Sequence, residues 1–450
     1  MSDELLDQAR AIAGRWLRAL PERHVGPLAD ASTLTLALGR PLTKTGEDPH
    51  TVLDDLARDV EPGLVASGGP RYYGFVVGGT LPVALAADWL VSAYDQMSFM
   101  HSSSPGMAVL EEVAAGWVLD VLGLPASAGV GFVTGAQMAN VTCLAVARNA
   151  VLAREGWDVL ADGLIGAPPI EVLVGDEVHV TVGRALRLIG LGEQRVTRVA
   201  VDANGAMDPG ALAQALAAGS GPAIVCAQAG NVNTGACDPL GQIADARTAR
   251  GAWLHVDGAF GLWAAASPAR AHLIDGHDLA DSWALDAHKW LNVPYDSALA
   301  IVRDATAYAT AIGMSAAYLA GSDQREPVGF APEASRRARA VPIYAAIRTL
   351  GRDGVAEIVD RCCSHAQLMA ELLRDGGAEV LNDVRLNQVL VAFDDAPDVV
   401  RRVQEDGTCW LGGTVWRGRG AVRISFSNWL TTDEDVHASA AAILRAAATT

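Results

Sequence analysis

Two stretches of the chain combine residue types that could do covalent chemistry together. The apolar stretch 253–259 ends in Asp257-Gly258-Ala259, and the stretch 284–290 contains the adjacent pair His288-Lys289. A lysine amine forms an imine with an aldehyde, and a carboxylate beside a pyridine nitrogen keeps that nitrogen protonated. Taken singly, Asp257 could cap a strand and Lys289 could be a solvated lysine. Together they predict an enzyme that binds pyridoxal 5′-phosphate (PLP) as a Schiff base on Lys289.

A third stretch suits the phosphate group of such a cofactor. Residues 134–137, Thr-Gly-Ala-Gln, follow the apolar run 131–133 and open a helical pattern. Backbone N–H groups at a helix N-terminus favour a phosphate, and small residues let the backbone approach it closely. Turns of this kind are common, so the prediction depends on Lys289. We expect Gly135, Ala136 and Gln137 to bind the cofactor, and we call residues 134–137 the phosphate loop.

His179 is a candidate for contact with the cofactor ring. It follows the apolar run 171–174, and in chain order it lies between the phosphate loop and Asp257. An imidazole at that place could stack on the ring and relay a proton. A single histidine is more often structural, but its position favours the functional interpretation.

The elements that must position these residues alternate along the chain. From about residue 80 to 304, Ala/Leu-rich helical runs alternate with short β-rich runs, which predicts an α/β fold with a mainly parallel sheet. Residues 335–450 predict a smaller α+β unit with a long helix from about 341 to 373. We expect three parts: an N-terminal helical arm (1–79), a large PLP-binding domain (80–334) and a small C-terminal domain (335–450).

The composition excludes several classes of protein. The 450 residues are 50% hydrophobic and 19% charged, with a formal net charge of -18, which fits a globular protein and argues against nucleic acid or an anionic membrane as partner. The longest apolar stretches are too short to span a bilayer, and the N-terminus lacks the pattern of a signal peptide. We therefore expect a cytoplasmic protein. The six cysteines are scattered without metal-ligand spacing, so no metal is expected.

These motifs resemble the group II PLP-dependent decarboxylases, the family of aromatic-L-amino-acid, glutamate and tyrosine decarboxylases, from about Arg71 to Thr432. The resemblance implies PLP fold type I (aspartate aminotransferase-like) and a homodimer with shared active sites. It also implies that Lys289, Asp257 and His179 are catalytic. The cofactor-binding residues that it implies are Gly135, Ala136, Gln137, His179, Asp257, Ala259, Asn231, His288 and Lys289.

The substrate residues are expected from the segments that look like the family's entrance and mobile loop. They are Phe75, Thr80, His101, Tyr318, Phe330 and Arg423. Apolar side chains in the stretch 72–80 favour an aromatic or hydrophobic amino acid. Arg423 sits where fold-type-I aminotransferases often keep a carboxylate-binding arginine, and a structural arginine at a strand start is an equally good interpretation.

The chain departs from the family pattern at several positions. Gln137 replaces a hydroxyl residue, Asn231 lies where the family has strand-end threonines, and Asp286 replaces an asparagine, which puts a second anion near the phosphate. The mobile-loop stretch 319–335 contains no tyrosine, whereas a loop tyrosine of the decarboxylases protonates Cα after CO₂ leaves. Another acid, Tyr318 or His101 of a partner subunit, could replace it.

The leading expectation is α-decarboxylation of an L-amino acid through the Lys289 Schiff base and a quinonoid. The alternatives are other PLP reactions: decarboxylative oxidative deamination to an aldehyde, β-elimination (C–S lyase) or transamination. A silent PLP-fold binding protein is a further alternative, against which the retention of Lys289, Asp257 and His179 argues.

Overall fold

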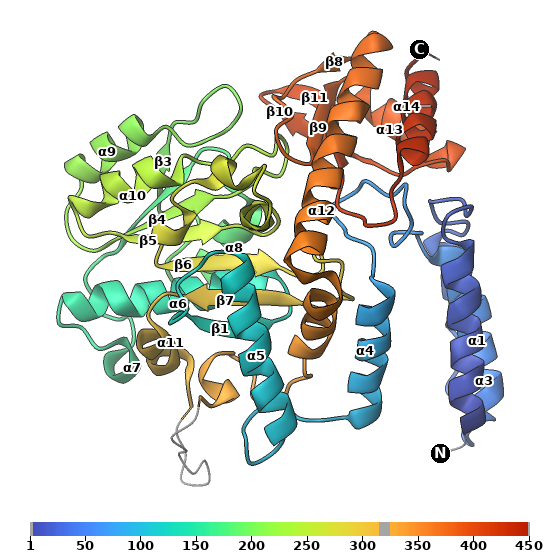
Figure 1. Ribbon diagram of the computed structural model, residues 1–450, viewed down its shortest axis with the longest axis horizontal. Helices are drawn as coiled ribbons and strands as arrows, with labels where there is room; N and C mark the ends of the chain where they lie inside the picture. The colour runs from blue at the N-terminus through green and yellow to red at the C-terminus, as the bar shows by residue number, and fades with distance from the viewer. Residues whose placement is uncertain (1–2, 315–324, 449–450) are drawn as a thin grey trace.

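The computed structural model describes residues 3–314 and 325–448. Figure 1 shows a large sheet covered by helices, a smaller sheet beside it, and the helices α1 and α3 standing to one side of both. The long helix α12 (Ala340–Asp375) runs along the body and connects the two sheets. The expected α/β architecture with a smaller C-terminal α+β part is present.

The large sheet has seven strands in the order β1-β7-β6-β5-β4-β2-β3. Their bounds are β1 Gly129–Val133, β2 Glu171–Gly175, β3 Val196–Val199, β4 Ala223–Gln228, β5 Trp253–Asp257, β6 Ser282–Asp286 and β7 Ala298–Val302. Only β7 runs antiparallel to its neighbours β1 and β6, so β1 and β6 point the same way as β2 to β5. The carboxyl ends of six strands therefore meet at one edge, where parallel α/β sheets bind their ligands.

Helices cover both faces of this sheet, and the strands are consequently apolar on both faces. The helices and short 3₁₀ turns of this part are α4 Pro82–Tyr94, α5 Pro105–Val121, α6 Ala136–Arg154, α7 Val159–Asp162, α8 Val180–Leu188, α9 Pro209–Ala218, α10 Leu240–Thr248, η2 Gly261–Ala266, η3 Ala271–Ile274, η4 His277–Leu279, α11 Ala305–Ile312 and η5 Pro327–Gly329. Many begin at a capping aspartate, as α9 does at Asp208, whose side chain accepts from two backbone N–H groups.

The small sheet is antiparallel with the order β10-β11-β9-β8. Its strands are β8 Glu379–Val380, β9 Gln388–Ala392, β10 Gly412–Trp416 and β11 Arg419–Ser425, and the helices α13 Ala396–Asp406 and α14 Asp433–Ala448 accompany it. The sequence predicted β9, β11, α12 and α14, but not β8, β10 or α13. The backbone of α12 is non-helical at Gly351, where φ is +63°, so the predicted long helix contains a break.

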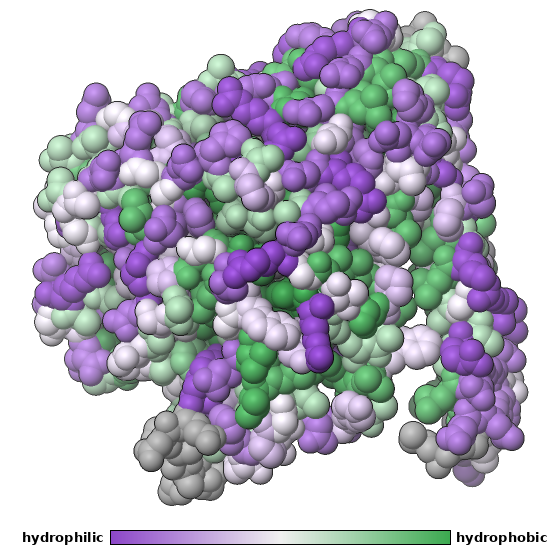
Figure 2. All heavy atoms as spheres, viewed as in Figure 1, coloured by the Kyte–Doolittle hydropathy of each residue, from purple (hydrophilic) through white to green (hydrophobic). Residues whose placement is uncertain are grey.

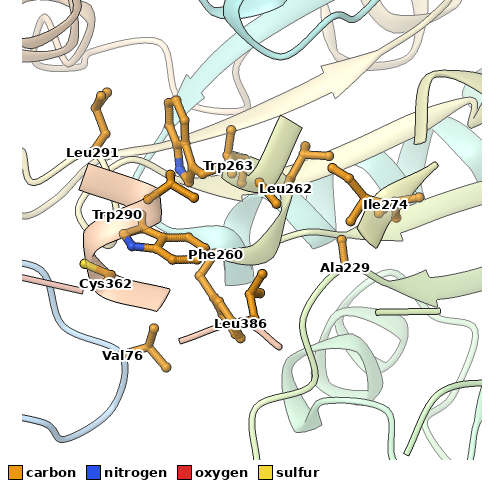
Figure 3. Packing of buried hydrophobic residues seen from close by; sticks show 14 of the residues in the cluster. Val76, Ala229, Phe260, Leu262, Trp263, Ile274, Trp290, Leu291, Cys362 and Leu386 are labelled. Atoms are coloured by element: carbon orange, nitrogen blue, oxygen red, sulfur yellow. The ribbon is translucent and has the colours of Figure 1, made fainter. Parts of the chain in front are cut away.

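One hydrophobic core extends from the large sheet through α12 to the small sheet. Figure 3 shows part of it around Trp290, the residue after Lys289, whose indole lies beside Cys362 of α12. Phe260 contacts the same indole edge-on, with ring centroids 6.3 Å apart. This packing fixes the backbone next to Lys289. Because both sheets share one hydrophobic core, the division of the chain into an arm, a large domain and a small domain at residues 79/80 and 334/335 remains our proposal.

The N-terminal arm consists of α1 (Asp3–Ala19), α2 (Ala31–Leu38), α3 (Pro49–Val60) and the turn η1 (Glu61–Gly63). None of these elements contains a buried residue. Leu6, Leu36 and Leu56 are 59%, 85% and 54% exposed. Figure 2 shows the arm standing away from the body, with hydrophobic residues among its polar ones. Among the described residues, no helix is long and apolar enough to cross a membrane.

Candidate active site

The predicted chemical residues come together at the carboxyl edge of the large sheet. Asp257 ends β5, Lys289 lies three residues after the end of β6, and these two strands are hydrogen-bonded neighbours. The phosphate loop follows β1, and His179 lies four residues after the end of β2. Residues from four separate strands therefore converge because their strands end at the same edge.

Lys289 is paired with a neighbouring carboxylate. Its Nζ lies 2.9 Å from Asp286 Oδ2, and the Asp286 side chain is only 4% exposed. Gly78 approaches from the other side so closely that a Cβ at this position would lie 1.9 Å from the Lys289 carbonyl oxygen. Glycine is therefore required at position 78.

Asp257 is held by a buried chain of hydrogen bonds. Asn140 Nδ2 donates to Asp257 Oδ2 at 3.2 Å, and His255 Nε2 donates to Asn140 Oδ1 at 2.9 Å. Behind them, Ser282 Oγ lies 2.9 Å from His255 Nδ1. Because the amide oxygen can only accept, the neutral His255 carries its proton on Nε2, and Ser282 donates to Nδ1. Burial lowers the pKa of His255 to about 4, so the ring stays neutral at neutral pH.

His179 is the N-cap residue of α8, and its tautomer is set by Thr181. The backbone N–H of Thr181 donates to His179 Nδ1 at 3.4 Å, and Thr181 Oγ1 lies 2.7 Å from the same nitrogen. Nδ1 is therefore an acceptor, and the ring proton is on Nε2. Burial lowers the pKa of His179, although the nearby Asp257 carboxylate opposes this shift.

The phosphate loop forms the N-terminus of the 19-residue helix α6, as predicted. The first N–H, that of Ala136, donates to Asp286 Oδ1 at 2.6 Å. Gln137 Nε2 donates to the carbonyl oxygen of Thr181 at 3.2 Å, so this amide does not depend on a phosphate for a partner. His288 Nδ1 is buried without a hydrogen-bond partner among the described residues. A helix N-terminus beside an unpartnered imidazole nitrogen fits a phosphate group.

The site residues fit PLP, and the family model decides the assignment. The model described as the pyridoxal-dependent decarboxylase conserved domain matches residues 37–394. The chain belongs to the pyridoxal-dependent decarboxylase family. PLP is its cofactor, and its reaction is the decarboxylation of an amino acid, a carboxy-lyase reaction.

Curated relatives in this family include proteins that are 26 to 29% identical to this chain. They include an aromatic-L-amino-acid decarboxylase of Bacillus atrophaeus (27% identity, 93% of this chain and 89% of the relative) and an L-2,4-diaminobutyrate decarboxylase of Rhizobium meliloti (29%, 88% and 82%). Among solved structures, Oryza sativa TDC with PLP and tryptamine has a TM-score of 0.92 at 23% identity, covering 99% of this chain and 97% of that one. The fold is PLP fold type I, as the sequence predicted.

The predicted entrance segment 72–80 lies against the backbone of the Lys289 loop. Asn292, fully buried with φ +53°, accepts the Gly79 N–H on Oδ1 at 2.7 Å and so ties this segment to the loop after Lys289. Phe75 is 64% exposed, and its ring centroid lies 5.6 Å from that of Trp410. Tyr72 stacks on the same indole with ring centroids 4.9 Å apart. We call Tyr72, Phe75 and Trp410 the aromatic cluster.

Arg423 of β11 comes from the small domain and lies close enough to lower the pKa of His179. Burial lowers the pKa of Arg423 itself. Among the described residues, its guanidinium has no ion pair or hydrogen bond. A half-buried guanidinium without a partner beside the active site fits a substrate carboxylate better than a purely structural role.

Several predicted residues are engaged elsewhere. Asn231 Oδ1 caps the turn 231–234, and Asn231 Nδ2 donates to Glu177 Oε2 at 3.3 Å. Phe330 is 7% exposed, with the Arg325 guanidinium 4.1 Å from its ring centroid, so it packs in the core of this subunit. His101 donates its backbone N–H to Glu326 at 2.9 Å. Tyr318 lies outside the described residues.

Sequence reasoning missed Asn140, Asn292 and Tyr295. Tyr295 packs on His288 with ring centroids 4.2 Å apart, yet it is 60% exposed. Burial raises the pKa of Tyr295 to about 12. Asn292 and Tyr295 could have been predicted as site residues because they follow Lys289 within six residues.

Proposed function

We propose that this decarboxylase acts on an aromatic or hydrophobic L-amino acid and that Lys289, Asp257 and His179 are its catalytic residues. The observation that carries the proposal is the convergence of these three side chains at one sheet edge, with the segment that carries Tyr72 and Phe75 packed against the Lys289 loop. The Bacillus relative, whose name gives aromatic amino acids as substrates, supports the same class.

Each catalytic residue would have a distinct task. Lys289 would hold the cofactor covalently through Nζ, and Asp257 would keep a proton on the pyridine nitrogen. His179 would lie against the ring and present Nε2–H. The bound cofactor supplies an electron sink that makes the Cα–carboxylate bond breakable. The other proposed cofactor residues are Gly135, Ala136, Gln137, Ala259, Asn231 and His288, among which Gln137 and Asn231 have the weakest support because their side chains have other partners.

The substrate would be held between a cation and the aromatic cluster. Arg423 would pair with its carboxylate, while Phe75 would contact its side chain. A paired carboxylate leaves less readily, so Arg423 would serve binding and orientation more than bond cleavage. The proposed substrate residues also include Thr80, His101, Tyr318 and Phe330, of which Phe330 has the weakest support because it packs in the hydrophobic core.

A second candidate is oxidative decarboxylation, in which the amino acid, O₂ and water yield an aldehyde, CO₂, ammonia and hydrogen peroxide. The observation favouring it is the absence of tyrosine from the sequence stretch 319–335. A relative from Rhodiola rosea, 27% identical over 80% of this chain and 74% of its own length, is named 4-hydroxyphenylacetaldehyde synthase. Tyr295 is an alternative proton donor that would preserve simple decarboxylation.

A panel of amino acids distinguishes these reactions in one run. The full chain with PLP is incubated with each of the aromatic, branched-chain and acidic amino acids and with 2,4-diaminobutyrate, and CO₂, amine, aldehyde, keto acid and peroxide are measured. We expect CO₂ and amine in equal amounts from an aromatic or hydrophobic substrate. Aldehyde with equimolar peroxide would select the second candidate, whereas turnover of acidic or diamino substrates alone would contradict the proposed substrate class.

The proposal includes a homodimer with shared active sites in the cytoplasm. The helices α1, α2 and α3 of the arm contain no buried residue in one subunit. A groove of about 640 Å³ between α1 and α4 is lined by Trp16, Leu17, Trp89 and other mostly apolar residues. We propose that a second copy of the chain fills this groove. The cysteines are free, and free cysteines are usual in a reducing compartment.

A further inference from the structure

The strand β10 of the small sheet covers every second one of its residues. Trp416 is buried and Gly412 and Thr414 are partly buried, whereas Gly413 and Val415 between them are exposed. The side chains of a strand alternate between its two faces, so positions 412, 414 and 416 share one face. We call this the inner face of β10.

The inner face contacts the loops of the large sheet that surround the site. Trp416 Nε1 donates to Oε2 of Glu177 at 3.0 Å, and Glu177 precedes His179 by two residues. Thr414 Oγ1 donates to Asn233 Oδ1 at 3.1 Å. Two of the three inner-face residues are therefore bonded to the large domain, and the third is a glycine.

Gly412 lies directly opposite Arg423 in the pairing of β10 with β11. Residues opposite one another in an antiparallel pair project from the same face, with their Cβ atoms about 5 Å apart. A Cβ at position 412 would have no heavy atom within 4 Å, and the φ of Gly412 is not positive. The backbone therefore does not require glycine here, and the missing side chain leaves open space beside Arg423.

Aromatic rings border this space on the side away from the strand's hydrogen-bonded end. Trp410 precedes Gly412 by two residues and forms a β-bridge with Tyr72, so the same alternation places its indole on the inner face. The indole contacts the rings of Tyr72 and Phe75. Gly412 thus lies between the Arg423 cation and the aromatic cluster, and these two groups suit the carboxylate and the ring of an aromatic amino acid.

We propose that Gly412 determines substrate specificity, because its missing side chain leaves the space in which the substrate lies between Arg423 and the aromatic cluster. A glycine inside a strand weakens the strand, and close approach of a ligand is one reason to keep it. A larger side chain at position 412 would exclude substrates that carry a ring before it excluded small ones. This inference rests on the proposed function and adds to it a residue that contacts the substrate.

The test measures binding of a ligand that has the ring and the carboxylate of an aromatic substrate but no amine. The probe is 3-phenylpropionate, which cannot displace Lys289 from the cofactor, and propionate serves as the probe without a ring. The full chain with PLP is titrated, and the visible absorbance of the bound cofactor gives the dissociation constants. The wild type is compared with Gly412→Ala and Gly412→Val. Alanine and valine suit a strand better than glycine, so the melting temperature should not fall.

Gly412→Ala should weaken binding of 3-phenylpropionate severalfold and Gly412→Val by about tenfold or more, with a smaller loss for propionate. Gly413→Val is the matched control. It adds the same side chain to the exposed face of β10, where a Cβ would lie 3.7 Å from Val400 Cγ2, and should bind both probes like the wild type. Equal affinity of the wild type and Gly412→Val for 3-phenylpropionate would overturn the proposal, and so would an equal loss for the two probes.

Two further measurements separate this inference from its alternatives. With the aromatic substrate that the panel selects, Gly412→Val should raise KM more than it lowers kcat, because the new side chain occupies binding space. Sedimentation should give the same mass for Gly412→Val and the wild type, and a lower mass would contradict the proposal by assigning the space to the subunit contact.

Failure of the inference and failure of the proposed function give different results. Tight binding of 3-phenylpropionate by both the wild type and Gly412→Val contradicts only the role of Gly412. A wild type that binds 3-phenylpropionate no better than propionate contradicts the aromatic substrate class, and the inference falls with it.

Discussion

Asn140 Nδ2 donates to Asp257 Oδ2 at 3.2 Å, although the two residues are 117 positions apart in the chain. The same amide accepts from His255, so Asn140 fixes both the position of the carboxylate and the tautomer of the histidine behind it. Asp257, the proposed partner of the pyridine nitrogen, is therefore held by residues from α6, β5 and β6 together.

Replacing Asn140 with leucine should weaken cofactor binding about tenfold to a hundredfold, because a hydrogen bond to a charged group is lost and His255 Nε2–H is left without a partner. The dissociation constant of PLP measures this. Asn149→Leu, on the same helix but bonded to Arg148 at its outer part, is the matched control and should bind PLP normally. Equal affinities of the wild type and Asn140→Leu would contradict the role of this contact.

Lys289 should be the only lysine that becomes covalently attached to the cofactor. The sequence contains two lysines, Lys44 and Lys289, so borohydride reduction followed by peptide mass spectrometry gives an unambiguous answer. Lys289→Ala should lose the visible absorbance of the bound cofactor and more than about a thousandfold of kcat. Lys44→Ala should keep both. Attachment of the cofactor to Lys44 would contradict the assignment of Lys289 as the Schiff-base lysine.

Thr181 should act on the reaction through His179. Thr181→Val keeps the backbone N–H that bonds His179 Nδ1 but removes the hydroxyl, so kcat should fall by about fivefold, the value of one hydrogen bond near 1 kcal/mol. Thr181→Ser should restore most of the rate. A rise in KM without a change in kcat would instead indicate that Thr181 acts in substrate binding.

Buried His255 should make the fold less stable in acid. Its pKa in the folded chain is about 4, below the usual value for histidine of about 6.5, so the unfolded chain binds the proton first as pH falls. The stabilisation is complete above pH 6.5 and is lost as pH falls towards 4, with a total on the order of 3 kcal/mol. Urea unfolding at pH 7 and pH 5 measures it. His255→Gln should reduce the difference, and His272→Gln, at an exposed position, should not.

The arm should carry part of the subunit interface. Sedimentation of the wild type should give twice the chain mass of 46.9 kDa. Leu6→Asp combined with Leu56→Asp places charges on two exposed apolar positions of the arm and should shift the protein towards the monomer. Leu160→Asp, an equally exposed leucine (60%) on α7, is the control. An unchanged mass for the double variant would exclude the arm from the interface.

The sequence by itself determined the chemical pair and the order of the main elements. Asp257 and Lys289 follow apolar strands, and the alternation of strands and helices predicts that parallel strand ends meet at one edge. This inference needs only local periodicity and the rule for parallel sheets. The weak strands β8 and β10 escaped it, because β8 has only two residues and β10, with the sequence Gly-Gly-Thr-Val-Trp, shows no alternation of apolar and polar side chains.

Only the tertiary structure decided which side chains face one another. In the folded chain, Asn231 bonds to Glu177, and Phe330 packs in the core. Asp286 lies between Ala136 and Lys289. Such contacts join residues up to 150 positions apart. Spacing along the chain predicts which residues share a face of one element, but the distance between elements depends on how all of their side chains pack.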